Sequence, residues 1–179
     1  MMTEKELFEY KKDCNVFIGI DPDCDKSGFA YVERSNHTIE SSSLSFYDLY
    51  RYLSNTRYDK RVVMIEGGWL NQGNWHIGSY RVTPAKAAAI GRHVGMNHQT
   101  GILLSQLCEN LDIPYEVVKP LPKHWAGPNG KITAEELEYF TGYSKRTNQD
   151  ERDAILLAWT YAGLPVRVKP IEGWCYGKG

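Results

Sequence analysis

Short apolar runs bounded by turn-forming residues predict five β-strands in this chain. The first two runs, at residues 16–20 and 28–32, are separated by the polar stretch 21–27, so we expect them to form a hairpin. The other strands are predicted at residues 38–44, 61–65 and 115–118, the first of these being the weakest pattern.

Helical spacing of apolar residues predicts four helices, at residues 46–53, 83–111, 134–140 and 148–162. The second is long and has a clear start, because Thr83 is a good N-cap and Pro84 suits the first helical position. One of its faces carries mostly small residues, which would let the helix lie close to a sheet or to another helix. These residues are Ala87, Gly91, Val94, His98, Gly101, Ser105 and Cys108.

The order of the elements, β-β-β-α-β-α-β-α-α, predicts a mixed sheet with helices packed on it. The sequence contains neither GxGxxG nor GxxxxGK[ST], which excludes an all-parallel nucleotide-binding fold with a glycine-rich phosphate loop. The longest apolar runs, 16–18 and 155–159, are far shorter than the ~18–20 residues needed to cross a bilayer. Residues 1–13 are charged and do not resemble a signal peptide, so we expect a soluble, cytoplasmic protein.

Length and composition are those of one globular domain, since 179 residues fall within the usual range for a single domain. The four cysteines form no CxxC pair and therefore predict neither a zinc site nor a disulfide framework. The net charge of −1 gives no general electrostatic argument for nucleic-acid binding, but the charges are unevenly distributed. Two stretches, 67–108 and 117–134, contain no acidic residue. Their basic residues include Arg81, Lys86, Arg92, Lys119, Lys123 and Lys131.

Four acidic residues stand at the ends of predicted elements. Asp21 follows the first strand, Glu66 ends the fourth, and Asp150 and Asp153 begin the last helix. Each alone is explained by a turn or by helix capping. However, the i, i+3 spacing places Asp150 and Asp153 on the helix face that continues into the core, where unpaired carboxylates would be costly. A divalent cation such as Mg²⁺ would compensate them, and pairs of such ions suit displacement at phosphorus.

Taken together, the segments around these acids resemble the RuvC family of Holliday-junction endonucleases, within the ribonuclease H-like superfamily. The matching segments are Phe17-Ile18-Gly19-Ile20-Asp21-Pro22, Gly28-Phe29-Ala30, Val63-Met64-Ile65-Glu66 and Asp150-Glu151-Arg152-Asp153-Ala154. The resemblance implies an α/β, ribonuclease H-like fold with a five-stranded mixed sheet whose first three strands are antiparallel. It covers a core of about residues 16–162 in a single domain, followed by a tail at 163–179.

The resemblance also implies a function. Asp21, Glu66, Asp150 and Asp153 would be catalytic ligands of two Mg²⁺ or Mn²⁺ ions, with water as the nucleophile that hydrolyses a DNA phosphodiester. The family is homodimeric, which places two sites on a four-way junction.

The remaining candidate residues concern nucleic-acid binding. Trp69 matches an aromatic position that the family stacks on a base, while Lys123 and Lys131 approximately match lysines near the scissile phosphate, so that Lys131 is also a candidate catalytic residue. Arg81, Lys86 and Arg92 are further candidate phosphate contacts because of the acid-free stretches around them. Asp23 stands where the family usually has glycine, and its role stays open.

Two other functions also stay open. One is an RNA-processing nuclease of the same superfamily, which would require a 2′-OH in its substrate. The other is a non-catalytic nucleic-acid-binding protein that retains the fold, although the presence of all four acids argues against it. An actin-like or sugar-kinase ATPase would need a second lobe for which this chain has no room.

Overall fold

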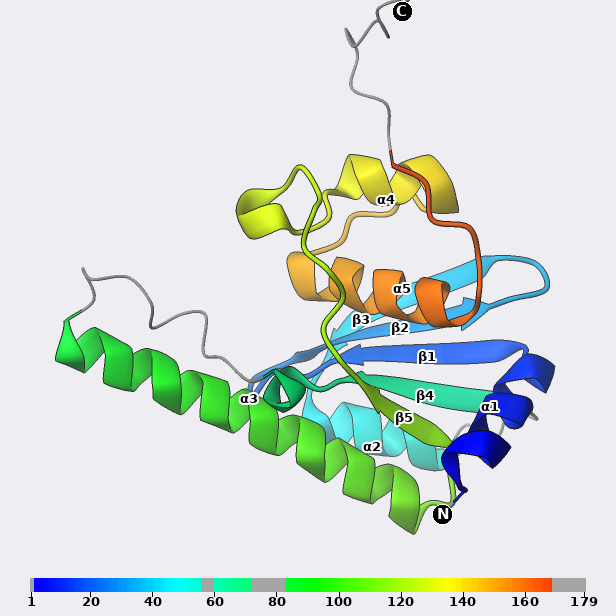
Figure 1. Cartoon of the computed structure of the whole chain (residues 1–179), viewed down its shortest axis with the longest axis horizontal. Helices are drawn as coiled ribbons and strands as arrows, with labels where there is room; N and C mark the ends of the chain where they lie inside the picture. Colours follow the sequence, from blue (N-terminus) through cyan, green and yellow to red (C-terminus); the bar gives the residue numbers. More distant parts are fainter. Residues whose placement is uncertain (1, 56–59, 72–82, 169–179) are drawn as a thin grey trace, which may run out of the picture.

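Five strands form one mixed sheet in the order β3-β2-β1-β4-β5 (Figure 1). The computed structural model describes residues 2–55, 60–71 and 83–168. The strands are β1 (Val16–Asp21), β2 (Ser27–Glu33), β3 (Thr38–Leu44), β4 (Arg61–Glu66) and β5 (Tyr115–Val118). The pairs β1–β2 and β2–β3 are antiparallel, whereas β4 runs parallel to both β1 and β5. This is the ribonuclease H-like sheet that the sequence motifs imply, so the predicted fold class is confirmed.

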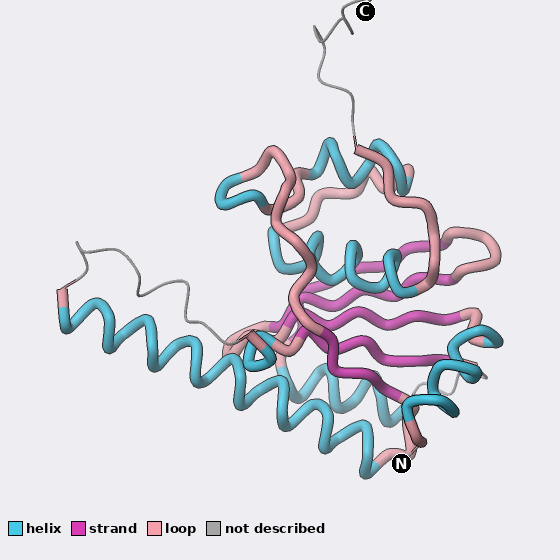
Figure 2. Tube along the Cα trace, viewed as in Figure 1, coloured by secondary structure: helices cyan, strands magenta, loops and turns pink. Residues whose placement is uncertain are grey.

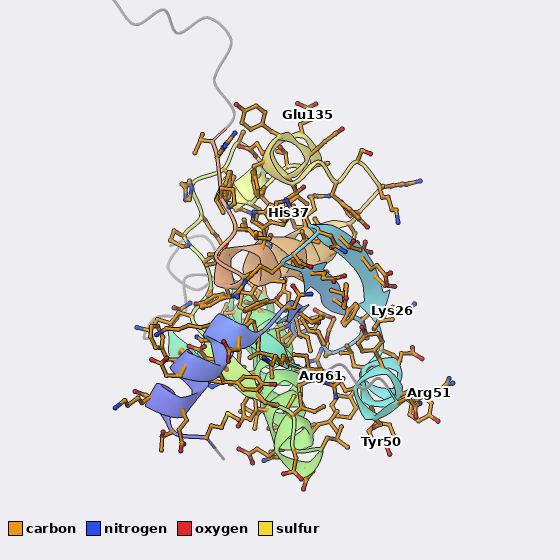
Figure 3. The ribbon with its side chains drawn as sticks, turned by 90° about the vertical axis from the view of Figure 1, so that its right-hand side faces the viewer. Lys26, His37, Tyr50, Arg51, Arg61 and Glu135 are labelled. Carbon is orange, nitrogen blue, oxygen red and sulfur yellow. The ribbon has the colours of Figure 1, made fainter. Side chains whose placement is uncertain are left out.

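Helices cover both faces of the sheet (Figures 1 and 2). The predicted helices are α2 (Phe46–Asn55), α3 (Pro84–Asn110), α4 (Ala134–Thr141) and α5 (Gln149–Tyr161). Alternate strand residues face opposite sides: Phe17 belongs to the core beneath α5, and Ile18 to the core beneath α2 and α3. On α2, Leu49 is buried against the sheet, while Tyr50 lies on the outer side (Figure 3). No described helix is both long and apolar enough to span a membrane.

A helix at the N-terminus, α1 (Glu4–Asp13), was not predicted from the sequence. The side chain of Thr3 accepts a hydrogen bond from the backbone of Glu6, whose carboxylate in turn accepts one from the backbone of Thr3. This reciprocal capping box starts the helix, although none of its residues is buried. The Thr-x-x-Glu pattern was therefore a usable signal, although the helix contacts the core only through partly buried residues such as Leu7 and Tyr10.

The long helix α3 is packed into the core at one end and extends beyond the sheet at the other (Figure 1). Its buried residues are Gly101, Leu104 and Cys108, all in its C-terminal half. A methyl group added at Gly91 or Gly95 would meet nothing within 4 Å. The predicted stripe of small residues therefore packs against the core over part of its length.

The helix α5 lies unusually close to the sheet because two strand residues lack side chains. A Cβ atom at Gly19 would lie 2.2 Å from the carbonyl oxygen of Ala154, and one at Gly28 would lie 2.1 Å from that of Asp150. Both separations are too short for any side chain. The two glycines therefore set the height of α5 above β1 and β2, and with it the position of the acidic residues on its first turn.

We predict that Gly28→Ala lowers the free energy of unfolding by about 1–3 kcal/mol, the range seen when a packed region is overfilled. Gly95→Ala is the matched control, because it adds the same methyl group in open space on a helix and should raise stability by up to about 1 kcal/mol. Urea unfolding of both variants measures the difference. Equal effects of the two substitutions would contradict the close approach of α5.

Candidate active site

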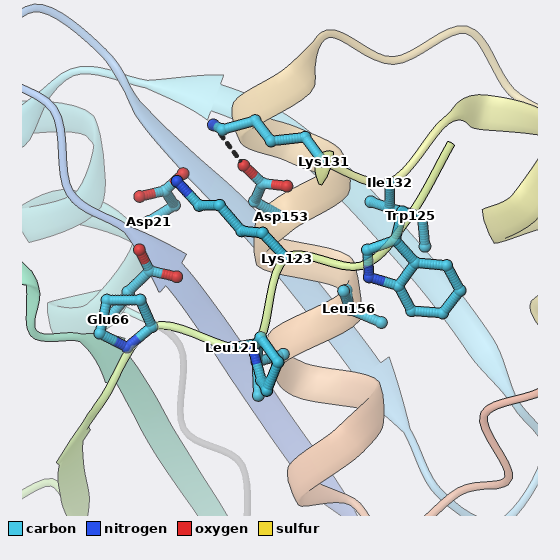
Figure 4. A pocket seen from close by; sticks show the side chains of 11 residues that line it. Asp21, Glu66, Leu121, Lys123, Trp125, Lys131, Ile132, Asp153 and Leu156 are labelled. Carbon is cyan, nitrogen blue, oxygen red and sulfur yellow. Dashed lines mark hydrogen bonds and ion pairs between the residues drawn. The ribbon is translucent and has the colours of Figure 1, made fainter. Parts of the chain in front are cut away.

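The parallel pairing of β1 and β4 places Asp21 and Glu66 side by side at the same end of the sheet. The first two turns of α5 bring Asp150 and Asp153 to this end from the side of the sheet that α5 covers. Oxygen atoms of Asp21, Asp150 and Asp153 lie within 4.8 Å of one another, and Glu66 lines the same pocket as Asp21 and Asp153 (Figure 4). The structure thus brings together the four acids that the sequence analysis singled out.

Three of the carboxylates, those of Asp21, Glu66 and Asp150, have raised pKa values because they lie close together in a partly buried site. Desolvation raises the pKa of Asp21 well above its ordinary value, and the charges of Glu66 and Asp153 raise it further. Desolvation, reinforced by Asp153, raises the pKa of Glu66 to about 7. The pKa of Asp150 is also raised, mainly by burial. This cluster therefore has an excess of negative charge that a bound cation would relieve.

Lys131 balances part of the negative charge of this cluster. Its Nζ donates a hydrogen bond to Oδ2 of Asp153 at 2.6 Å, and Gln149 donates to the other oxygen of that carboxylate at 2.8 Å. Burial lowers the pKa of Lys131, but the hydrogen bond and charge of Asp153, together with the charge of Asp21, more than offset this, so the pKa is raised overall. Lys131 is therefore a firmly charged partner of the site.

A short loop delivers the two candidate lysines to the same place. Gly130 has φ of 73°, in the left-handed region, and a Cβ atom there would lie 2.8 Å from the carbonyl oxygen of Lys123. The backbone N–H of Trp125 donates to the carbonyl of Gly130 at 3.0 Å, and that of Gly127 to the carbonyl of Lys131 at the same distance. These bonds fold the loop back on itself, so that Lys123 and Lys131 both line the pocket.

The pocket, of about 80 Å³, has an acidic end and an apolar end (Figure 4). Asp21, Glu66 and Asp153 line the first, and the second includes Leu121, Trp125, Ile132 and Leu156. It adjoins a wider groove of about 1070 Å³ that passes between the ends of the strands and α3. The acids are therefore reachable by a large substrate.

Trp69, expected from the sequence to stack on a base, is half-buried on the wall of this groove. Its ring packs edge-on against His98, with 6.0 Å between the ring centroids, and would be 2.4 Å from a methyl group at Gly101. The small residue in α3 thus makes room for the indole. Trp69 supports the packing of α3 as well as lining the groove, and its role in stacking stays a prediction.

Two other candidate phosphate contacts lie on α3, at the end that extends beyond the sheet (Figure 1). Lys86 and Arg92 are exposed on the N-terminal half of α3. Arg81 lies outside the described residues, as does most of the predicted tail.

Trp125 is a site residue that the sequence analysis did not identify. It is 7% exposed, and its Nε1 has no hydrogen-bond partner among the described residues. Figure 4 shows the indole nitrogen on the side facing the pocket. A buried N–H without an acceptor is unfavourable, so a substrate oxygen in the pocket would be a favourable partner. The sequence offered one signal for it, because Trp125 lies between Lys123 and Lys131 in a stretch without acidic residues.

The donor set fits a hard divalent cation. Mg²⁺ and Mn²⁺ prefer oxygen ligands, and the cluster offers several carboxylates in a small, partly buried space with Lys131 as a direct cationic partner. Asp21, Asp150 and Asp153 are the residues closest to sharing one ion, and Glu66 adds a fourth carboxylate at the pocket.

Comparison with solved structures finds similar chains among Holliday-junction resolvases. Residues covering 81% of this chain are similar to 90% of RuvC from T. thermophilus in complex with a Holliday junction substrate, with 16% identity and a TM-score of 0.46. For the Fowlpox virus resolvase in complex with Holliday junction DNA, the similarity covers 83% of this chain and 97% of that one, with 16% identity and a TM-score of 0.45. The yeast mitochondrial Holliday junction resolvase is similar over 89% of this chain and 86% of its own, with 12% identity and a TM-score of 0.32.

No protein-family model and no curated protein matches the sequence. The order and directions of the five strands are those of a ribonuclease H-like fold. Within that class, the chain is similar in structure to RuvC and to the viral and mitochondrial resolvases.

We predict that the metal-free protein loses stability as the pH rises from 4.5 to about 7. The first value is the ordinary pKa of a glutamate, and the second is the raised pKa of Glu66 in the folded protein. The folded protein binds this proton more tightly than the unfolded chain, so the free energy of unfolding falls as the proton is removed. Glu66→Gln should flatten this part of the profile in EDTA. Glu138→Gln, which changes an exposed carboxylate on α4, is the control. If the stability of both variants depended on pH in the same way, the pKa of Glu66 would not be raised in the folded protein.

We predict that Trp125→Phe costs less stability than the matched Trp159→Phe. Both remove part of a buried indole, but Nε1 of Trp159 donates to the carbonyl of Pro165 at 3.0 Å, whereas Nε1 of Trp125 has no acceptor among the described residues. An unpaired buried polar group costs about 1–3 kcal/mol, so the two variants should differ by about that amount in urea unfolding. A larger loss for Trp125→Phe would show that its N–H is satisfied in solution.

Proposed function

We propose that this protein is a metal-dependent endonuclease that hydrolyses phosphodiesters in branched DNA, with four-way junctions as its preferred substrate. The observation that carries the proposal is the convergence of Asp21, Glu66, Asp150 and Asp153 beside Lys131 at one end of the sheet. The motif resemblance supplies the reaction and the substrate class, and the groove beside the acids offers the space that a nucleic acid needs.

In this proposal the four acids hold two Mg²⁺ or Mn²⁺ ions. When bound, such ions lower the pKa of a water nucleophile and stabilise the charge that develops on the phosphate. Glu66 and Asp21 hold the ions from the sheet side, and Asp150 and Asp153 hold them from α5. Lys131 keeps Asp153 oriented through their hydrogen bond and presents positive charge to the scissile phosphate.

Other residues position the substrate. Lys123 faces the phosphate from the same loop as Lys131, and the N–H of Trp125 donates to a substrate oxygen in the pocket. Trp69 stacks on a base along the wall of the groove, which is worth roughly 1–3 kcal/mol per base. Lys86 and Arg92, with Arg81, contact the phosphates of the flanking DNA.

A homodimer is part of the proposal, because two sites must act on the strands of one junction. The half of α3 that extends beyond the sheet leaves Ala85, Ala88, Ala89 and Met96 exposed. A second copy covering this surface would bury them.

An RNA-processing nuclease is the second candidate, since it would use the same acids. The convergence of all four carboxylates in one site weighs against a non-catalytic binding protein, because their mutual repulsion serves no purpose without a cation.

The test is cleavage of a labelled panel comprising four-way and three-way junctions, flaps, duplex and RNA hybrids, with Mg²⁺, Mn²⁺ or EDTA. We predict metal-dependent cleavage of junctions that falls at least ~100-fold in Asp21→Asn, since even residues that only orient metal ligands contribute 10–100-fold. Binding of the junction should persist in this variant.

Asp112→Asn is the matched control, because it makes the same change on an exposed turn where the left-handed backbone, with φ of 52°, accepts asparagine. Cleavage in EDTA, or full cleavage by Asp21→Asn, would refute the proposed metal site. Preference for RNA would favour the second candidate.

A further inference from the structure

A second group of potential metal ligands lies across the groove from Lys131, where the turn after β1 meets α3. Asp23 and Cys24 come from this turn, and His93 comes from the exposed half of α3. Ligand atoms of the three side chains lie within 4.8 Å of one another, and Sγ of Cys24 is 4.0 Å from Nδ1 of His93. Cys24 and His93 are 69 positions apart in the sequence, and they come together only because the long helix packs against the turn.

The separation of the Cys24 sulfur and the His93 nitrogen is close to that of two ligands of one zinc ion. With Zn–S of about 2.3 Å and Zn–N and Zn–O of about 2.0–2.2 Å, ligands of a tetrahedral site lie about 3.4–3.6 Å apart. The observed separation of sulfur and nitrogen is therefore about half an ångström too long, which a small rotation of either side chain would correct. Three protein ligands leave one tetrahedral position for water.

The turn is also held in place by a residue that is not itself a ligand. Asn97, one helical turn after His93, donates from Nδ2 to Oδ2 of Asp23 at 3.0 Å and accepts from the backbone N–H of Cys24 at 3.0 Å. Ser27 receives a hydrogen bond from the backbone N–H of Asp23 at 3.1 Å. Hydrogen bonds of this kind orient ligands before a metal binds and are typical of the outer shell of metal sites.

We propose that Asp23, Cys24 and His93 form a binding site for a thiophilic divalent cation, with Zn²⁺ as the ion that the donor set favours. Thiolate and imidazole ligands select zinc, whereas the all-carboxylate centre around Asp21 favours Mg²⁺ or Mn²⁺. The two sites are thus chemically distinct, although Asp23 and Asp21 both line the groove. The proposal is independent of nuclease activity.

A cation at this site would link the exposed half of α3 to the turn beside the acidic cluster. The buried residues of α3 begin at Gly101, so His93 lies on the part of the helix that has no buried residues. The ion would therefore fix one wall of the groove. It also gives a role to Asp23, which stands where the resembling family usually has glycine.

Cobalt substitution provides the test, because a thiolate bound to Co²⁺ produces a charge-transfer absorption band that carboxylate ligands do not. The full chain, kept reduced with a non-thiol reductant, is titrated with Co²⁺ in a large excess of Mg²⁺, and Zn²⁺ is then added. We expect a band that saturates at one Co²⁺ per chain and is abolished by one equivalent of Zn²⁺.

Variants assign the ligands. Cys24→Ser should abolish the band, and His93→Gln and Asp23→Asn should each weaken cobalt binding at least tenfold, while their melting temperatures in EDTA stay near that of the parent. Asp21→Asn and Cys175→Ser should retain the band, since the first removes a ligand of the other centre and the second a different thiol. Hydrogen exchange should show slower exchange around residues 21–27 and 93–97 when Zn²⁺ is present.

Absence of the band, or a band that survives Cys24→Ser, would overturn the proposal. A band that is lost in Cys24→Ser but keeps its full affinity in His93→Gln would also overturn it, because the thiolate would then bind cobalt without the helix.

Discussion

The candidate site depends on the close contact between α5 and the sheet. The backbone of α5 at Asp150 and Ala154 lies almost on the strands at Gly28 and Gly19, closer than any side chain would permit. This contact joins the core above the sheet, where Ile155 is fully buried, to the acidic turn of the same helix. Hydrophobic packing along α5 therefore holds Asp150 and Asp153 opposite Asp21 against the repulsion of their charges.

This arrangement shows a conflict between stability and chemistry. The packing of α5 is favourable, but it confines carboxylates whose pKa values are raised by desolvation and by one another. Lys131 relieves part of the repulsion through Asp153, leaving Asp21 and Glu66 without a direct ion pair among the described residues. Functional sites commonly carry such a cost because the rest of the fold is stable enough to support it.

The sequence predicted the strands and the later helices because their apolar runs have the period of each element. The i, i+3 spacing correctly indicated that Asp150 and Asp153 share a face, whereas the meeting of all four acids was implied by family motifs. The helix α1 was missed since it has no fully buried residue and contacts the core only through partly buried ones such as Leu7 and Tyr10. The acid-free stretch around Lys123 and Lys131 could have pointed to Trp125, whereas the position of His93 beside Cys24 depends on contact with a segment distant in the chain.

The partial support of α3 has a mechanical consequence. Its 27 residues form a rod of about 40 Å, and its buried residues occupy one end. From Gly101 back to Pro84 the helix is about 25 Å long, so a small rotation of the helix displaces its N-terminal end by a larger distance than the part that lines the groove. A rotation of about 5° around the buried C-terminal part of α3 would move the exposed N-terminal end by about 2 Å. The groove wall at Val94, about 10 Å from Gly101 along the helix, would then move by about 1 Å, whereas Trp69, which packs at Gly101, would stay in place.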